Sequence, residues 1–90
     1  MVLLLSYDLR GKERPENYEA VATAIKGKAI SYRRPLYSQW LVETDESPQV
    51  WSDLLSSVAD EDDGWLVVRV QPPYQGWLAS DVWEWLRPRV

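Results

Sequence analysis

The segment Val2–Leu9, with the sequence VLLLSYDL, constrains the fold more than any other part of the chain. Successive side chains of a strand point to opposite faces. One face of this segment is apolar or aromatic throughout, with Leu3, Leu5 and Tyr7. The other face begins with Val2 and Leu4 and ends with Asp8, so both faces begin apolar. Such a strand is typical of a sheet centre that is covered on each side, and we therefore expect a central strand that ends at Asp8.

The small size of the chain limits how much surface it buries on folding. A chain of 90 residues forms one domain and buries only about 60–65% of the surface that it exposes when unfolded. It has no cysteine, so no disulfide adds stability. Oligomerisation is the remaining common device. Six tryptophans and five tyrosines supply large apolar side chains for cores and interfaces, and we expect a homodimer.

Two helices follow from start signals and apolar periodicity. Pro15 suits the first position of a helix, where its missing N–H costs nothing, and Gly27 suits the end. Between them, apolar side chains recur at the spacing of one helical face, at Tyr18, Val21, Ala22 and Ile25. Ser47 as N-cap and Pro48 as first residue predict the start of a second helix. Its apolar stripe consists of Trp51, Leu54, Leu55 and Val58.

Three further strands complete the pattern. Residues 29–43 contain two of them as a hairpin, and Pro35 marks the first, at residues 30–34, as an edge strand because proline has no N–H for the ladder. The last strand is Trp65–Val70, with the sequence WLVVRV. The resulting order is β-α-β-β-α-β. It predicts an α+β fold of the ferredoxin-like type, with one antiparallel sheet and both helices on one face.

This ferredoxin-like domain spans residues 1–71, and residues 72–90 form a C-terminal tail. The tail is unusually aromatic, with Trp77, Trp83 and Trp85. Ser80 is a candidate cap for a short helix that ends at Leu86, before Pro88. We expect the tail to dock on its own domain or on a partner subunit.

The two predicted helices leave the second face of the sheet open. Leu4, Leu41 and either Val67 or its neighbours would be exposed there in a monomer. A symmetric dimer that buries this face is the simplest solution.

Charge and hydropathy narrow the choice of partners. The longest apolar run, Val2–Leu5, is far shorter than the roughly 18 residues that a membrane span requires, so we expect no membrane partner and a cytoplasmic location. The net charge is −4, which argues against broad electrostatic binding of nucleic acid. Residues 1–34 nevertheless carry seven Lys and Arg against four Asp and Glu, so a local basic surface is compatible with the sequence.

Four segments together resemble the SinR-like family. They are SYDL at the end of the first strand, ENYEAVATAIK, PLYSQWLVET and the last strand WLVVRV, within residues 2–71. This family is related to the small CRISPR-associated adaptation subunit, which is also described as an endoribonuclease, and more distantly to VapD-type toxins. The resemblance implies a ferredoxin-like homodimer. It also implies that Asp8, at the end of the first strand, is a metal ligand and catalytic residue.

Asp8 is therefore the first candidate site residue. One carboxylate from each subunit at the dimer axis would offer Mg²⁺ two hard oxygen ligands, and the metal would activate a water for attack on a phosphodiester. The chain has no histidine, so a histidine base is excluded. The alternative is that Asp8 accepts backbone N–H groups in the turn after the strand.

Basic residues supply the candidate nucleic-acid contacts. Arg10, Lys12 and Arg14 follow Asp8 and would form a phosphate-binding loop; the alternative is an ordinary solvated loop. Arg33 and Arg34 lie on the predicted edge strand, where they contact phosphate or, in the alternative that we favour, protect the edge from aggregation.

The sequence leaves three functional hypotheses open. The first is a non-catalytic binding or scaffolding module that engages nucleic acid or a partner protein. The second is a Mg²⁺-dependent endoribonuclease built around Asp8, and the third is a toxin–antitoxin component. The first two differ in metal dependence and in the effect of removing Asp8.

Overall fold

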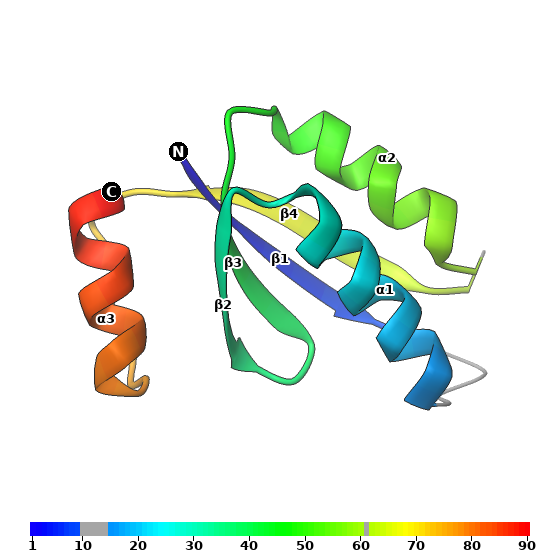
Figure 1. Cartoon of the computed structure of the whole chain (residues 1–90), viewed down its shortest axis with the longest axis horizontal. Coiled ribbons are helices and arrows are strands. Elements are labelled where there is room, and N and C mark those ends of the chain that lie inside the picture. The colour runs from blue at the N-terminus through cyan, green and yellow to red at the C-terminus, as the bar shows by residue number, and fades with distance from the viewer. Residues whose placement is uncertain (10–14, 61) are drawn as a thin grey trace.

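The computed structural model describes residues 1–9, 15–60 and 62–90 (Figure 1). Within these ranges the fold is α+β, with one four-stranded antiparallel sheet and three α-helices. The strands are β1 (Val2–Asp8), β2 (Ser31–Leu36), β3 (Gln39–Glu43) and β4 (Gly64–Val70). The helices are α1 (Pro15–Lys28), α2 (Pro48–Val58) and α3 (Ser80–Leu86), and a 3₁₀ turn follows at Arg87–Arg89. The predicted order of elements is confirmed.

The sheet has the strand order β2-β3-β1-β4, so β1 occupies a central position, as predicted. Leu5 lies opposite Trp40 of β3 on one side and Val67 of β4 on the other. On the reverse face, Leu4 lies between Leu41 and Val68. The alternation of side chains therefore assigns each apolar set to one face.

The helices α1 and α2 cover the face that carries Leu5. A single core joins this face to both helices, with Leu3, Leu5, Tyr7, Leu9, Val21, Ala22, Ile25, Trp40, Val42, Trp51 and Leu55. The two fully buried indoles in it have partners, because Trp40 Nε1 donates to Tyr7 Oη at 2.9 Å and Trp51 Nε1 donates to Thr44 Oγ1 at 3.0 Å. Large aromatic side chains thus enter the core without an unsatisfied N–H.

The helix-start signals behave as expected in two of three helices. Pro15 is the first residue of α1, and Ser47 caps α2 by accepting the N–H of Val50 at 3.3 Å. In α3 the N-cap is Ala79, without a side-chain hydrogen bond, and Ser80 is the first helical residue. The prediction that Ser80 caps the third helix is therefore wrong by one position.

The hairpin of β2 and β3 forms with β2 at the edge of the sheet. The strand β2 continues through Pro35 to Leu36, and its register with β3 shifts between Arg33 and Leu36. The proline thus produces an irregularity rather than the end of the strand, as expected for an edge position where its missing N–H faces solvent.

The C-terminal tail covers much of the second face of the sheet. Figure 1 shows α3 on the opposite side of the sheet from α1 and α2. Val82, Trp85 and Leu86 form a second core with Val2 and Leu41, and the exposed fraction of Leu41 is only 4%. The expectation that Leu41 is exposed in a monomer is wrong, because the tail of the same chain buries it.

The tail does not cover the part of β4 that contains Leu66 and Val68. Leu66 and Val68, which lie on the same face as Leu41, remain 63% and 38% exposed. None of the helices in the described part of the chain is long and apolar enough to cross a membrane.

Candidate functional site

Asp8 lies at the open end of β1, opposite Gly64 of β4, with an exposed side chain. A shallow depression surrounds it, lined by Ser6, Tyr7, Asp8, Ser38, Gly64, Trp65 and Leu66. Of the described residues in this lining, Asp8 is the one that is acidic. Among the described residues, no three His, Cys, Asp or Glu side chains lie close enough to hold one metal ion.

A single carboxylate is a poor Mg²⁺ site by itself. Mg²⁺ is usually held by one or two carboxylates together with waters and substrate phosphates. The described residues of a single subunit supply one carboxylate here, that of Asp8. These residues therefore fit Mg²⁺ only when a second subunit or a phosphate adds further oxygen ligands. The metal site at Asp8 therefore stays a prediction.

The predicted phosphate-binding loop of Arg10, Lys12 and Arg14 lies outside the described residues. The structure does not test it.

Arg33 is part of the tail contact. Its guanidinium lies 5.6 Å from the ring centre of Trp85, and Nη1 donates to the carbonyl oxygen of Tyr32 at 2.8 Å. Nε lies 3.9 Å from a carboxylate oxygen of Asp81 in α3. A guanidinium over an indole ring gains a cation–π interaction. Arg33 therefore helps to hold α3 against β2.

Arg34 projects to the other face of the sheet. Its guanidinium lies 4.7 Å from the ring centre of Tyr37 and 4.8 Å from that of Trp40, and Nε donates to the carbonyl oxygen of Tyr37 at 2.9 Å. Nη2 is buried and has no hydrogen-bond partner among the described residues. Because the side chains of Arg33 and Arg34 lie on opposite faces of the sheet, they do not form one phosphate-binding patch.

Tyr7 lies in the same aromatic environment, and its pKa is shifted. Burial raises the pKa of Tyr7 above its usual value of 10.0, while the hydrogen bond from Trp40 and the positive charge of Arg34 act in the opposite direction. The hydroxyl accepts the N–H of Trp40 inside the core. Its role is structural, since it gives a buried indole its partner.

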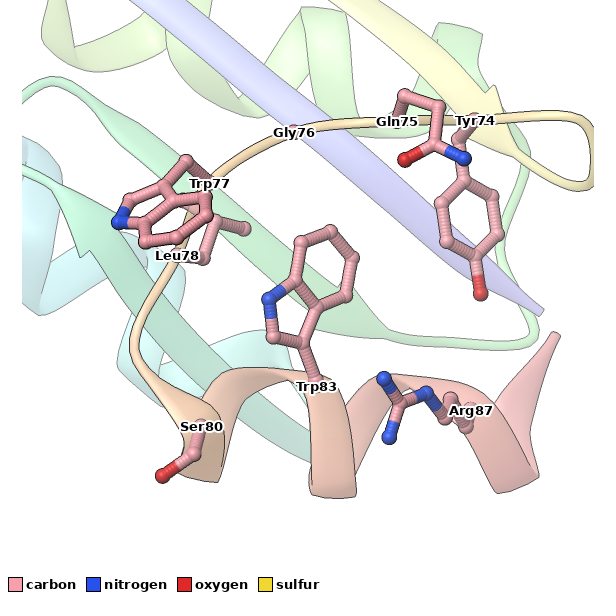
Figure 2. Close-up of a pocket in the computed structure, with 8 residues that line it drawn as sticks. All are labelled: Tyr74, Gln75, Gly76, Trp77, Leu78, Ser80, Trp83 and Arg87. Atoms are coloured by element: carbon pink, nitrogen blue, oxygen red, sulfur yellow. The ribbon is translucent and has the colours of Figure 1, made fainter.

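A second concave surface lies on the tail. Residues 74–78 and α3 enclose a hollow of about 490 Å³ (Figure 2). We call it the aromatic hollow, and its lining consists of Tyr74, Gln75, Gly76, Trp77, Leu78, Ser80, Trp83 and Arg87. Trp77 is 98% exposed, an unusual state for the largest apolar side chain.

The aromatic rings of this hollow have a defined geometry. The rings of Tyr74 and Trp83 are nearly parallel, with an interplanar angle of 7° and centroids 6.1 Å apart. If the two planes are separated by about 3.5 Å, the usual carbon–carbon contact, the rings are displaced sideways by roughly 5 Å. Each ring therefore leaves part of a face open.

The polar groups of the aromatic hollow are available for a ligand. The side chains of Gln75, Ser80 and Arg87 are exposed, and within the described residues none of them makes a hydrogen bond or ion pair. The described residues of the lining include no carboxylate, histidine or thiol. The hollow is therefore equipped to bind by ring contacts and donated hydrogen bonds, and it lacks the groups of a general acid or base.

The sequence signals the tail's aromatic content but not the hollow. In α3, Val82, Trp85 and Leu86 follow the i, i+3, i+4 spacing of a buried stripe, which leaves Trp83 beside that stripe. Trp77 precedes the helix in an irregular segment. An aromatic residue outside the buried stripe is the one signal that points to this surface.

No family model matches the chain, and no curated protein is detectably similar to it.

Proposed function

We propose that this protein is a small, homodimeric, non-catalytic binding module with a ferredoxin-like fold. In the strand order, β3 separates β1 from β2, and α1 connects those two strands. This split β-α-β arrangement supports the ferredoxin-like assignment. The proposal retains the expected cytoplasmic location and, for residues 2–71, the resemblance to SinR-like proteins.

The fully exposed Trp77 beside the aromatic hollow is the observation that carries the binding function. An exposed tryptophan that flanks a concavity is a preferred anchor for a partner, because its large apolar face is desolvated on binding. The neighbouring rings of Tyr74 and Trp83 extend this apolar surface.

The ligand that fits these groups best is a proline-rich segment of a partner protein in the polyproline II conformation. Aromatic-lined grooves are the usual docking sites for such segments. The backbone carbonyls of this conformation have no internal partners, so the side-chain donors of Gln75 and Arg87 match them.

Single-stranded nucleic acid fits the same surface less well. Binders of single strands combine aromatic platforms with a basic groove that follows the phosphates. Arg87 is the one cationic side chain among the described lining residues, and the chain carries a net charge of −4. A protein partner is therefore favoured over RNA.

The Mg²⁺-dependent nuclease and the toxin–antitoxin component remain the alternative functions. The nuclease has less support, because Asp8 is the one acidic side chain that the described part of the chain contributes to its depression.

A binding assay tests the proposed function. A panel of proline-rich peptides and a single-stranded RNA of similar length would be titrated into the wild-type protein and followed by tryptophan fluorescence, at low and at high salt. Trp77→Ala should weaken peptide binding at least tenfold, since truncation of an anchoring aromatic residue typically costs this much or more. Ile30→Ala is the matched control, because Ile30 is exposed outside the hollow.

Two results would contradict the proposal. One is the absence of binding to every peptide of the panel, and the other is equal peptide affinity of wild type and Trp77→Ala. If RNA binds more tightly than the peptides and its affinity falls steeply as the salt concentration rises, the ligand is nucleic acid and not a peptide, because phosphate contacts are salt-sensitive.

A further inference from the structure

The two edges of the sheet differ in how they are protected. Edge strands usually carry charges, proline or irregularities that prevent pairing with another chain. The edge strand β2 has all three, since it contains Arg33, Arg34 and Pro35 and its register is irregular. The other edge, β4, runs over seven residues with the sequence GWLVVRV and with a regular register to β1. It contains no proline, and Arg69 is its one charge.

The backbone of β4 has a defined set of groups that face outward. The N–H of Thr44 donates to the carbonyl oxygen of Met1 at 3.0 Å, and the amino group of Met1 donates to the carbonyl oxygen of Thr44 at 3.1 Å. The N–H of Tyr7 donates to the carbonyl oxygen of Ser38 at 3.1 Å. Odd-numbered residues of β1 therefore turn their backbone groups toward β3, and even-numbered residues turn theirs toward β4. The even-numbered partners in β4 face β1 in return. The N–H and C=O groups of Trp65, Val67 and Arg69 consequently point away from the sheet.

The side chains next to this edge are apolar and uncovered. Leu66 and Val68 are exposed, and they lie beyond the cover that the tail provides. On the helix face, Trp65 and Val67 are half-buried against the α2 side of the sheet. A long edge with free backbone groups and exposed apolar side chains is typical of an interface or an aggregation site.

We propose that the β4 strands of two copies pair antiparallel across a two-fold axis, so that one sheet continues through both subunits. This inference rests on the homodimer in the proposed function and names its interface. The occupant is a second copy, because the edge is self-complementary: outward-facing residues alternate regularly along it, and a two-fold axis at Val67 pairs all seven residues of β4.

The register of the proposed pairing between the two β4 strands follows from the alternation of outward-facing and inward-facing backbone groups along β4. With the axis at Val67, Trp65 lies opposite Arg69 of the partner subunit, and these residues exchange backbone hydrogen bonds. A cation and an indole then meet on the helix face. Leu66 lies opposite Val68 of the partner subunit in a non-hydrogen-bonded pair, where side chains approach most closely. The acidic turns at Asp62 and Asp63 fall at opposite ends of the paired strands, so they do not repel each other.

The first test is the mass of the full chain in solution, measured by light scattering at micromolar concentration. The wild type should have the mass of a dimer. Leu66→Lys combined with Val68→Lys should raise the dissociation constant at least tenfold, because it places like charges next to the axis. Ile30→Lys, a charge at an equally exposed position away from the edge, should leave the dimer intact. Circular dichroism confirms that each variant is folded.

The register has its own test, because the chain contains no cysteine. Opposite residues of a non-hydrogen-bonded pair lie about 4.5 Å apart at Cα, within the range of a disulfide. Leu66→Cys combined with Val68→Cys should therefore form a disulfide-linked dimer under mild oxidation, and either single variant should form far less. A single variant that cross-links as fully as the double variant would overturn the register centred on Val67.

The outcomes separate this inference from the proposed function. A wild-type dimer that persists in the double lysine variant would overturn the β4 interface and leave the homodimer standing. A wild-type monomer would overturn both the interface and the homodimer. Peptide binding through Trp77 is measured independently, so its loss or survival bears on the binding module alone.

Discussion

Trp85 and Ser31 lie 54 positions apart in the sequence and are joined by a hydrogen bond of 2.8 Å, from the indole Nε1 to the hydroxyl Oγ. This contact attaches α3 to β2. Arg33 and Arg89 both place guanidinium groups by the indole ring, at 5.6 and 4.6 Å from its centre, and Arg89 also pairs with Glu43 at 3.0 Å. The tail is thus an integral part of the fold and positions the aromatic hollow.

Replacement of Trp85 should destabilise the whole protein. Trp85→Ala should lower the free energy of unfolding by about 3–5 kcal/mol, the usual cost of removing a buried large aromatic side chain. Urea denaturation followed by circular dichroism measures this change. Trp77→Ala is the control and should stay within about 0.5 kcal/mol of wild type, because its side chain is exposed. Equal stability of Trp85→Ala and wild type would mean that the tail does not hold the sheet face.

Arg33 should contribute to stability and not to RNA affinity. Arg33→Ala removes a cation–π contact with Trp85 and should cost about 0.5–1 kcal/mol. The side chain is partly exposed, so solvent screening keeps the contribution small. Denaturation and RNA titration of the same variant check both parts. A large loss of RNA affinity at unchanged stability would instead favour the phosphate-contact hypothesis for Arg33.

Alkaline pH should weaken the fold through Tyr7. Burial raises the pKa of Tyr7 in the folded state, so above about pH 10, the pKa of an unperturbed tyrosine, the unfolded chain releases this proton while the folded chain retains it. The contribution of Tyr7 to the free energy of unfolding is therefore fully present below about pH 10, and it is lost as the pH rises through the folded-state pKa of Tyr7. Denaturation curves at a series of pH values measure the decline.

Tyr7→Phe isolates this effect from the other tyrosines. It should show a smaller decline at alkaline pH than wild type. At neutral pH it should lose about 1–3 kcal/mol, because the buried N–H of Trp40 loses its acceptor. An identical alkaline decline in both proteins would exclude Tyr7 as the cause.

Replacement of Asp8 should not change the behaviour of the protein toward nucleic acid. In a cleavage panel of single-stranded RNA, duplex RNA and duplex DNA with Mg²⁺, Mn²⁺ or a chelator, wild type and Asp8→Ala should behave alike. The physical reason is that a lone carboxylate offers too few ligands for a catalytic metal. Metal-dependent cleavage that disappears in Asp8→Ala would establish the nuclease hypothesis instead.

The sequence predicts the elements of this fold well because their signals are local. Pro15, Ser47 and Pro48 mark helix starts by backbone chemistry that does not depend on the rest of the chain, and all three occupy the expected positions. The alternation of β4 likewise assigns Leu66 and Val68 to one face. Local patterns of this kind survive in the folded protein because tertiary packing reinforces them.

The position of the tail and the contacts of Arg33 and Arg34 depend on residues that are distant in the sequence. The sequence shows an aromatic tail but not that Trp85 reaches Ser31 or that Leu41 is buried under α3. Arg33 and Arg34 are adjacent in sequence, and strand alternation sends them to opposite faces. Their roles follow from the partners Trp85 and Trp40, which only the assembled fold supplies.

The most direct test of the binding function is a two-dimensional nuclear magnetic resonance spectrum of the six indole N–H groups, recorded during titration with a proline-rich peptide that binds. We predict that the resonances of Trp77 and Trp83 shift and saturate with the peptide, while those of the buried Trp40 and Trp51 stay in place. Saturating binding without any shift of Trp77 or Trp83 would contradict the assignment of the aromatic hollow as the binding site.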